Sequence, residues 1–566
     1  MEKQHFNLVS EPWIKVIDAQ NDREVTVSLQ EAFQNAPRYR QMAGDMRSQD
    51  LAILRFLLAI LTTVYSRVDS KGNRYTWLKQ DTTSGRMLLE KSADLDTMRE
   101  EMLETWKDLY EQGCFTPAVR EYLESYKDRF DMFGERPFYQ VRQDVYDHFA
   151  TKKIETGTGT VAVKQINRLI SESNNSPSIF APRVGGTKND IDLPELVRWL
   201  ITYQNFTGVT DKTKVNVKEK YSISSGWLYG IDPVVVKGET LFETLLLNLL
   251  LYPEQETEVL QYPVWEFEDM AEYIKIRLKG LLPPNLAELY TVLSRILYIE
   301  PKDKMFVIFA CGLPKIENAN AFIEPMTTWK YDKKESKYKP RSKWIKSLGK
   351  TMWRNFGQYV GLETTDGSHG AEPGIVKWLN LLKDEGILPA GKLLHLQTIG
   401  MVNDGNATSQ SPVAEVYDDL SIRAGVLFDH SGEEAVSCWP AQIEATIQLT
   451  QKVGEAFWTF GRNWALLRGL GDGAVGFANS VTTRFYDGLN KPFLDWLASL
   501  RIEQEPDAEL ERWKKLLLRQ ADTLREQLLQ SATPQDMCGQ SSGDGRPQNI
   551  FLLNNQLRQT IRNYLG

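Results

Sequence analysis

The alternation of apolar and polar residues predicts strands at the start of the chain. The stretches "FNLVSEPWIKVID" (residues 6–18) and "REVTVSL" (residues 23–29) are rich in β-branched and aromatic residues, and they flank a turn-like "AQND". Two such runs around a short polar turn are typical of an antiparallel hairpin. We therefore expect an N-terminal β-hairpin.

Helical spacing replaces this alternation further along the chain. Apolar residues recur every three to four positions in residues 48–68, 94–113 and 116–130, which predicts three helices. Ser48 is the expected N-cap of the first helix, and Gly113 is expected to end the second. The segment "TLFETLLLNLL" (residues 240–250) is predicted to be a buried helix or strand.

Polar segments without periodicity separate these elements. Residues 155–163, 171–190 and 205–226 are rich in Gly, Ser, Thr and Asn, and residues 398–416, "TIGMVNDGNATSQSPVAEV", form another turn-rich stretch. Long segments of this kind inside a compact domain are functional loops or disordered. Glycine in such loops also lets a backbone approach a ligand closely.

Four amphipathic helical patterns occupy the C-terminal part of the chain, in residues 441–469, 481–502, 507–530 and 548–566. Helices of 18 or more residues with short connections predict a four-helix bundle. The predicted fold class is α+β, with a large mixed α/β N-terminal domain (residues 1–425) followed by a C-terminal four-helix bundle (residues 426–566).

Composition and charge limit the function classes. The 566 residues carry a net charge of -8, which argues against bulk, unspecific nucleic-acid binding but allows a local basic patch. Four widely spaced cysteines without a CxxC pair fit a reduced compartment. No apolar leader opens the chain, and the apolar run "LAILRFLLAILTTVY" is interrupted by Arg55 and too short for a comfortable membrane span. We therefore expect a soluble cytoplasmic protein.

No catalytic constellation stands out in the sequence. The five histidines form no HExxH or HxH motif and no close pair with cysteine. The glycine-rich "GLGDGAVG" (residues 469–476) follows a helix rather than a strand, and therefore fits an inter-helix turn better than a phosphate loop. The acidic "DHSGEE" (residues 429–434) fits a helix start at Ser431 better than a metal site. These features favour a non-enzymatic binding or scaffold subunit without cofactor or metal.

One strongly basic segment stands against the acidic background. Residues 329–356 carry ten Lys and Arg side chains opposed only by Asp332 and Glu335. Five aromatic residues are interleaved with these charges, as in surfaces that contact phosphates and stack on bases or sugars. A solvated, mobile lysine-rich loop is the alternative interpretation. The interleaving and the local reversal of charge favour a polyanion-binding face.

Several landmarks resemble one protein family. The opening "FNLVSEPWIKV" is similar to the N-L-x-x-x-x-W-I-x-V start of the CasA family, the large subunit of the type I-E CRISPR surveillance complex Cascade. The helix "DLAILRFLLAIL", the segment "FDMFGERPFYQV", the segment "GETLFETLLLNLL" and the C-terminal bundle follow in the family's order. The similarity spans the whole chain, although each motif is short.

This resemblance implies a DNA-recognition subunit rather than an enzyme. Such a subunit reads the protospacer-adjacent motif (PAM) in double-stranded DNA, wedges the duplex open so that R-loop formation starts, and helps to recruit a helicase-nuclease. The implied partners are the backbone, small and handle-binding Cascade subunits, the CRISPR guide RNA, double-stranded target DNA and the helicase-nuclease. Protein then reads a short duplex motif while base pairing reads the rest.

The family's loop residues are transferred to matching positions in this chain. Phe180 in "SPSIFAPRVGG" matches the Phe that meets the guide-RNA handle, with a core anchor at the loop base as the alternative. Gly208 in "NFTGVTDK" matches the glycine loop at the minor groove, although the family has several glycines there. Gly226 in "SISSGW" is a second candidate, and Gly208 could equally be a simple turn residue.

The family's lysine finger has no direct counterpart. Counting along "ANAFIEPMTTWKYDKK" places Met326 at the lysine's position, so Lys330 is the closest replacement, with Lys333 and Lys334 behind it. Minor-groove readout mostly separates A·T from G·C, so a permissive or shifted motif is expected. Further contacts to the DNA backbone or the displaced strand are expected from Lys337, Lys339, Arg341, Lys343, Arg462, Arg468 and Arg484.

The family's wedge is a glutamine at a loop tip that prises apart the first base pair, and insertion costs a few kcal/mol per base step. Residues 398–416 lie where this wedge belongs, with a solvated connector as the alternative interpretation. Asn406 is followed by Ala407, like the family's Gln-Ala, whereas Gln410 keeps the amide type and the spacing to Glu415. We prefer Gln410. Two rivals remain for the whole chain: a metal-dependent nuclease with an unrecognised acidic site, and a scaffold that binds only protein.

Overall fold

The structure is a computed structural model in which residues 5–81, 87–90, 93–154, 159–169, 182–207, 212–251, 260–302, 305–343, 349–362, 370–403, 412–430, 438–541 and 547–566 are described. The chain divides into two compact units. Unit 1 comprises residues 1–347, 372–382 and 396–417, and unit 2 comprises residues 348–371, 383–395 and 418–566. The predicted domain limits at residues 425 and 426 stay a prediction.

Unit 1 begins with the predicted hairpin. Strands β1 (Ile14–Asp18) and β2 (Arg23–Val27) pair antiparallel, and β3 (Tyr39–Met42) adds to the other edge of β1. Helix α1 (Leu29–Gln34) follows β2 directly. Its N-cap Ser28 accepts from the backbone N–H of Glu31, whose carboxylate accepts from the N–H of Ser28. This reciprocal capping fixes the turn from strand to helix.

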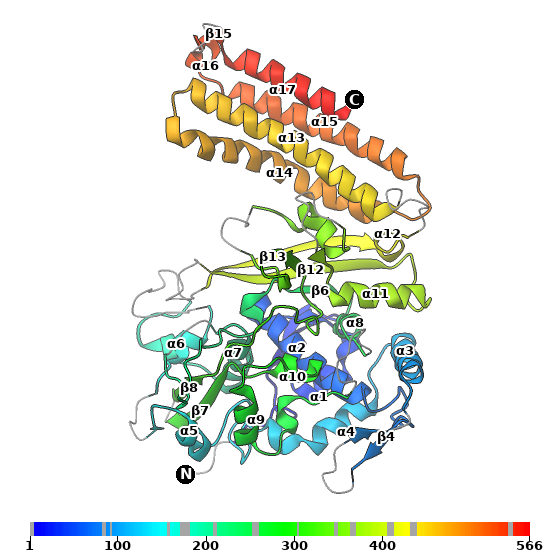
Figure 1. Cartoon of the computed structure of the whole chain (residues 1–566), viewed down its shortest axis with the longest axis vertical. Coiled ribbons are helices and arrows are strands. Elements are labelled where there is room, and N and C mark those ends of the chain that lie inside the picture. Colours follow the sequence, from blue (N-terminus) through cyan, green and yellow to red (C-terminus); the bar gives the residue numbers. More distant parts are fainter. Residues whose placement is uncertain are drawn as a thin grey trace. The chain divides into compact units, whose positions relative to one another are not determined.

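Helix α2 (Arg47–Tyr65) is the core of unit 1, packed against α7 (Leu193–Asn205) and α10 (Leu286–Thr291) (Figure 1). It begins after Met46, so the prediction of Ser48 as N-cap is wrong. Among the described helices, α2 alone has the length and composition to cross a membrane. However, 94% of its apolar window is buried inside the protein.

The remaining elements of unit 1 surround this core. Gly113, with φ at +70°, ends α3 as predicted, because this left-handed conformation suits glycine. The segment "TLFETLLLNLL" is a helix, α8. The other helices are α3 (Leu95–Gln112), α4 (Pro117–Ser125), α5 (Gln143–Phe149), α6 (Val163–Ile166), α8 (Leu241–Leu247), α9 (Met270–Arg277) and α11 (Gly374–Asp384).

The strands in the described part of the chain form several small sheets rather than one large one. Strands β7 (Arg295–Lys302) and β8 (Met305–Gly312) pair antiparallel, as do β4 (Leu78–Gln80) and β5 (Met87–Leu89). A third sheet has the order β13-β12-β6. Its strands are β6 (Val234–Lys237), β12 (Leu393–Asn403) and β13 (Pro412–Arg423), and the short β11 spans Gly370–Ala371.

Unit 2 contains the predicted four-helix bundle. Helices α13 (Trp439–Leu467), α14 (Ala474–Ser499), α15 (Pro506–Gln530) and α17 (Ile550–Leu565) pack side by side (Figure 1). The glycine-rich stretch before α14 is the expected inter-helix turn, with a 3₁₀ segment at Gly471–Gly473. Shorter elements are α12 (Ala424–Leu427), α16 (Pro534–Cys538), β14 (Gln540–Ser541) and β15 (Pro547–Gln548).

Aromatic packing and small residues hold the bundle together. Phe493 stacks on Trp353 with ring centroids 4.2 Å apart, and its ring meets that of Trp513 edge-on at 5.0 Å. At Gly461 an added Cβ would lie 3.0 Å from the Cα of Ala478, so glycine allows α13 and α14 to approach closely.

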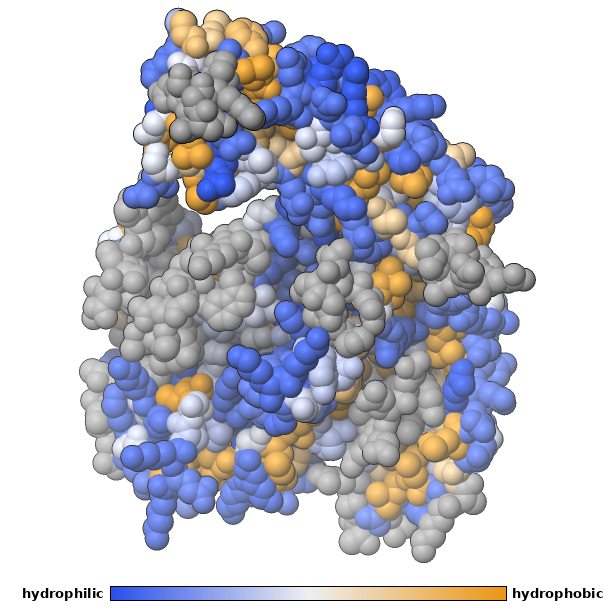
Figure 2. All heavy atoms as spheres, turned by 45° about the horizontal axis from the view of Figure 1, so that its top comes forward, coloured by the Kyte–Doolittle hydropathy of each residue, from blue (hydrophilic) through white to orange (hydrophobic). Residues whose placement is uncertain are grey.

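On the face drawn in Figure 2, hydrophilic side chains predominate and apolar ones form small separate areas.

Candidate nucleic-acid interface

The basic segment folds as a short β-hairpin in unit 1. Strands β9 (Trp329–Asp332) and β10 (Lys337–Pro340) pair antiparallel, and Lys330 lies directly opposite Lys339. In the connecting turn, one carboxylate oxygen of Asp332 accepts from the backbone N–H groups of Lys334 (2.9 Å) and Glu335 (3.3 Å). This side-chain-to-backbone bonding fixes the turn and holds its lysines at the tip.

The two faces of the hairpin differ in character because side chains alternate along a strand. One face is aromatic: the rings of Tyr331 and Tyr338 lie 5.0 Å apart, and Phe322 contacts both Trp329 and Tyr338. The opposite face carries the lysines of both strands. The hairpin is therefore anchored through its aromatic face and presents a basic face.

The lysines of the basic face are not equivalent. Lys330, Lys333, Lys334 and Lys337 are exposed. Lys339 donates to Asp332 (3.0 Å) and to Glu335 (2.6 Å), and this hydrogen bond from Lys339 is the first cause of the lowered pKa of Asp332. The charge of Lys339 is thus largely compensated within the hairpin. The four exposed lysines form what we call the lysine face.

The two basic residues after the hairpin are less exposed than those of the lysine face. Arg341 and Lys343 are both half-buried. The ammonium of Lys343 donates to the hydroxyl of Thr398 at 2.8 Å and lies 3.5 Å from a carboxylate oxygen of Asp232. Thr398 begins the turn-rich segment 398–416. Lys343 therefore ties the end of the basic segment to the strand that leads into the candidate wedge.

The arginines predicted on the bundle also differ from one another. Arg462 and Arg484 are exposed. Arg468 forms a bidentate pair with Asp536, with nitrogen–oxygen distances of 2.9 and 2.6 Å, and this bonding holds the pKa of Asp536 well below its usual range. Such charge-assisted pairs are strong. Of the three, Arg468 has its guanidinium committed inside unit 2.

The interpretation of the interleaved tryptophans as stacking platforms is wrong at two positions. Trp329 is 2% exposed and Trp353 is 1% exposed. The indole of Trp353 donates to the side-chain oxygen of Asn490 at 2.8 Å, in addition to its stacking on Phe493. Both tryptophans are core residues, because the apolar rings are more stable packed inside than exposed.

Four predicted site residues lie outside the described residues: Phe180, Gly208, Asn406 and Gln410. The structure does describe the two strands that flank the last two of them. Past the loop, the carboxylate of Glu415 accepts from the backbone N–H of Ser48 at 2.6 Å, at the start of the core helix α2. The roles proposed for these four residues stay predictions.

Two other positions considered in the comparison with the family, Met326 and Gly226, are buried in the protein. Met326, where counting along the sequence places the family's lysine finger, is fully buried, and its sulfur lies 3.6 Å from the guanidinium of Arg55. Gly226 is buried with φ at +90°, and an added Cβ would lie only 2.2 Å from the carbonyl oxygen of Asn205. Gly226 thus serves close backbone packing.

Replacing Gly226 by alanine is expected to lower the free energy of unfolding by about 2 kcal/mol or more, since strain at a left-handed position adds to a clash with backbone. Gly185→Ala is the matched control, because Gly185 also has a left-handed φ, at +56°, but has nothing within 4 Å of its added Cβ. Thermal unfolding measures both. Equal shifts for the two variants would mean that packing at Gly226 contributes nothing.

The described residues offer no group of three or more His, Cys, Asp or Glu side chains that could hold a metal ion. None of the four cysteines, all of which lie in the described part of the chain, forms a disulfide bond. Asp429 of the acidic "DHSGEE" stretch accepts from the backbone N–H of Trp439 at 2.9 Å, at the first residue of α13. The expected helix start at Ser431 lies outside the described residues.

The chain thus combines a mixed α/β unit with a helical bundle, and the lysine face is a candidate polyanion-binding surface. The family model of the CRISPR-associated protein Cse1 matches residues 7–524, and the chain belongs to the Cse1 family. The resemblance to the CasA family, the large subunit of type I-E Cascade, is thereby confirmed. A search of curated proteins finds no match.

Several solved structures share the fold of this chain. Thermobifida fusca Cse1 matches with a TM-score of 0.75 and 21% identity, covering 99% of this chain and 98% of that chain. Thermus thermophilus CasA (Cse1) matches with a TM-score of 0.66 and 18% identity over the full length of both chains. A chain of a CRISPR RNA-guided surveillance complex matches with a TM-score of 0.62 and 14% identity, with 99% of each chain covered. The predicted fold class is confirmed.

Proposed function

We propose that this chain is the non-catalytic, PAM-reading subunit of an RNA-guided Cascade complex that works in the cytoplasm. Membership of the Cse1 family and the match to a chain of an RNA-guided surveillance complex support assembly with other Cascade subunits and a guide RNA. In this function the protein binds duplex DNA at a short motif, starts R-loop formation and helps to recruit the helicase-nuclease.

The lysine face is the observation that carries the DNA-binding part of the proposal. Four exposed lysines gather on one short hairpin of a chain with net charge -8. A local positive surface on an acidic protein attracts a polyanion to one place rather than to the whole molecule. Lysines bind phosphates as point charges, so this face supplies affinity and register, whereas motif reading requires contacts to base edges.

The decisive experiment compares complexes reconstituted with and without this chain. Electrophoretic mobility shifts are measured on duplex targets that differ only in the flanking motif. We expect tight binding only with the chain present and only with a permitted motif. Target binding that is the same without the chain, or the same for every flanking motif, would exclude the proposal. Metal-dependent cleavage by the isolated chain would favour a nuclease instead.

Replacing Gln410 by alanine is expected to slow opening of a duplex target more than it weakens binding to a target melted beforehand. The physical reason is that a wedge offsets unstacking, which costs a few kcal/mol per base step, and a pre-melted target has no such cost. Fluorescence of 2-aminopurine beside the motif reports opening. Asn406→Ala is the paired variant; a larger opening defect there would move the wedge to Asn406, and equal losses on both targets would argue against a wedge.

A further inference from the structure

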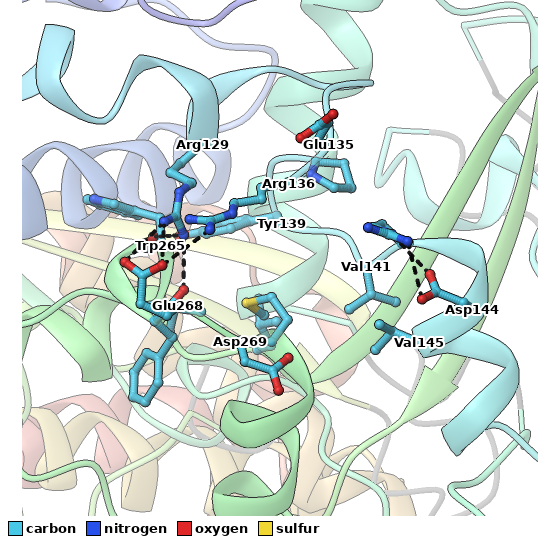
Figure 3. Close-up of a pocket in the computed structure, with 16 residues that line it drawn as sticks. Arg129, Glu135, Arg136, Tyr139, Val141, Asp144, Val145, Trp265, Glu268 and Asp269 are labelled. Atoms are coloured by element: carbon cyan, nitrogen blue, oxygen red, sulfur yellow. Dashed lines mark hydrogen bonds and ion pairs between the residues drawn. The ribbon is translucent and has the colours of Figure 1, made fainter. Parts of the chain in front are cut away.

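A pocket of about 400 Å³ lies in unit 1 and includes none of the hairpin lysines (Figure 3). Its walls come from two chain segments, residues 129–145 and residues 264–270, together with Leu293. This volume falls within the range of pockets that hold a ligand group. The apolar part of the lining includes Tyr139, Val141, Val145, Trp265 and Phe267.

Tyr139 gives the pocket an unused hydrogen-bond donor. The residue is only 7% exposed and has a left-handed φ of +53°, which is rare for a bulky side chain. Its ring stacks on Phe138 at 4.4 Å. In the described part of the chain its hydroxyl has no hydrogen-bond partner, and burial raises its pKa well above the usual value, so the hydroxyl stays protonated. A protonated hydroxyl without a protein partner can donate a hydrogen bond to a group that enters the pocket.

The rim of the pocket is organised by ion pairs. Arg129, 9% exposed, and Arg136 share the carboxylate of Glu268 at 3.4 and 3.2 Å, and Arg142 pairs with Asp144 at 3.1 Å (Figure 3). These contacts hold the guanidiniums in place without a ligand. The carboxylates outnumber the guanidiniums: four are contributed by Glu135, Asp144, Glu268 and Asp269, against three from Arg129, Arg136 and Arg142.

We propose that this pocket binds an aromatic side chain of a partner polypeptide that carries a basic residue next to it. An apolar floor inside a polar, ion-paired rim is the arrangement of an anchor pocket in a protein interface. A peptide always offers backbone carbonyls as acceptors for the Tyr139 hydroxyl. The excess of carboxylates attracts a cation and disfavours a nucleic acid, whose phosphates would meet net negative charge.

The test uses blocked dipeptides and the full-length chain. Ligand-observed NMR titrations compare acetyl-phenylalanyl-arginine amide with acetyl-phenylalanyl-glutamate amide and acetyl-alanyl-arginine amide. We expect the first to bind at least about fivefold more tightly than either of the others, since it alone combines the apolar anchor with the cation. Equal binding of all three peptides would overturn the proposal.

Variants locate the binding. Val145→Trp fills the pocket and should abolish binding of the first peptide, whereas Tyr139→Phe removes only the hydroxyl and should weaken it about threefold. Val184→Trp is the control, because Val184 is 73% exposed and lies outside the pocket. Retained binding in both pocket variants would refute the pocket as the site. Displacement of the peptide by an eight-residue oligothymidylate would instead assign it to nucleic acid.

Discussion

Replacing Glu324 by alanine is expected to lower the free energy of unfolding of unit 1 by about 3–5 kcal/mol. Arg55 and Glu324 are both fully buried and form two parallel hydrogen bonds of 2.8 Å each. The carboxylate of Glu324 also accepts from the indole N–H of Trp227 at 2.6 Å. Removing it leaves a buried guanidinium without its counter-charge and an indole donor without its acceptor.

An exposed pair provides the control for this effect. Lys127 and Glu124 lie 3.1 Å apart with side chains 43% and 46% exposed, so Glu124→Ala should cost less than about 1 kcal/mol. Urea unfolding followed by the fluorescence of the chain's 15 tryptophans measures both variants. Similar midpoints for the two variants would show that the buried pair contributes no more than a surface pair.

A double variant separates loss of the pair from loss of packing. Arg55→Met combined with Glu324→Leu removes both charges and keeps apolar volume in the site. Buried ion pairs replaced in this way are often neutral or stabilising, so the double variant should be markedly more stable than Glu324→Ala. In both the single and the double variant, the indole N–H of Trp227 lacks its acceptor. A double variant as unstable as the single one would locate the defect at Trp227 instead.

Elements whose cause is local could be predicted from the sequence. The hairpin of β1 and β2 and the four helices of the bundle follow from periodicity and turn residues within each segment. The start of α2 could not, since its Ser48 N–H is satisfied by Glu415, 367 residues further along the chain. The start of a helix can be recognised from the sequence only when the side chain that bonds its first N–H groups is close in the chain.

The candidate site could be predicted as a segment but not as a set of available charges. Residue type identified the basic stretch, whereas the structure distinguishes exposed Lys333 from Lys343, which contacts Thr398 and lies near Asp232. Trp353 likewise looks like a stacking residue beside its charged neighbours but belongs to the core. Tyr139 has no sequence signal at all, because its left-handed backbone conformation and its place in a pocket wall are visible only in the structure.

The quadruple replacement of the lysine face by glutamine, at Lys330, Lys333, Lys334 and Lys337, is expected to weaken target binding. It should also lower the slope of log affinity against log salt concentration by roughly 2–4 units, because each phosphate contact contributes about 0.9 to that slope. The loss should be similar for every permitted motif, since phosphate contacts carry no sequence information. Mobility shifts of the reconstituted complex between 50 and 200 mM salt measure both quantities, and thermal unfolding should show little change, as all four side chains are exposed.

The matched control removes four positive charges at other positions of unit 1. Lys71, Lys107, Lys275 and Lys279 are exposed and lie outside the hairpin, so their replacement by glutamine tests net charge alone. We expect this control to lower the slope by less than about 1 unit, because long-range effects are screened within about 10 Å at 0.1 M salt. A second control, Lys339→Gln, should also have a small effect, since Asp332 and Glu335 already compensate that charge. Equal slopes for the hairpin and control quadruple variants would show that the lysine face is only a solvated surface, and DNA affinity would then have to come from other loops of the chain.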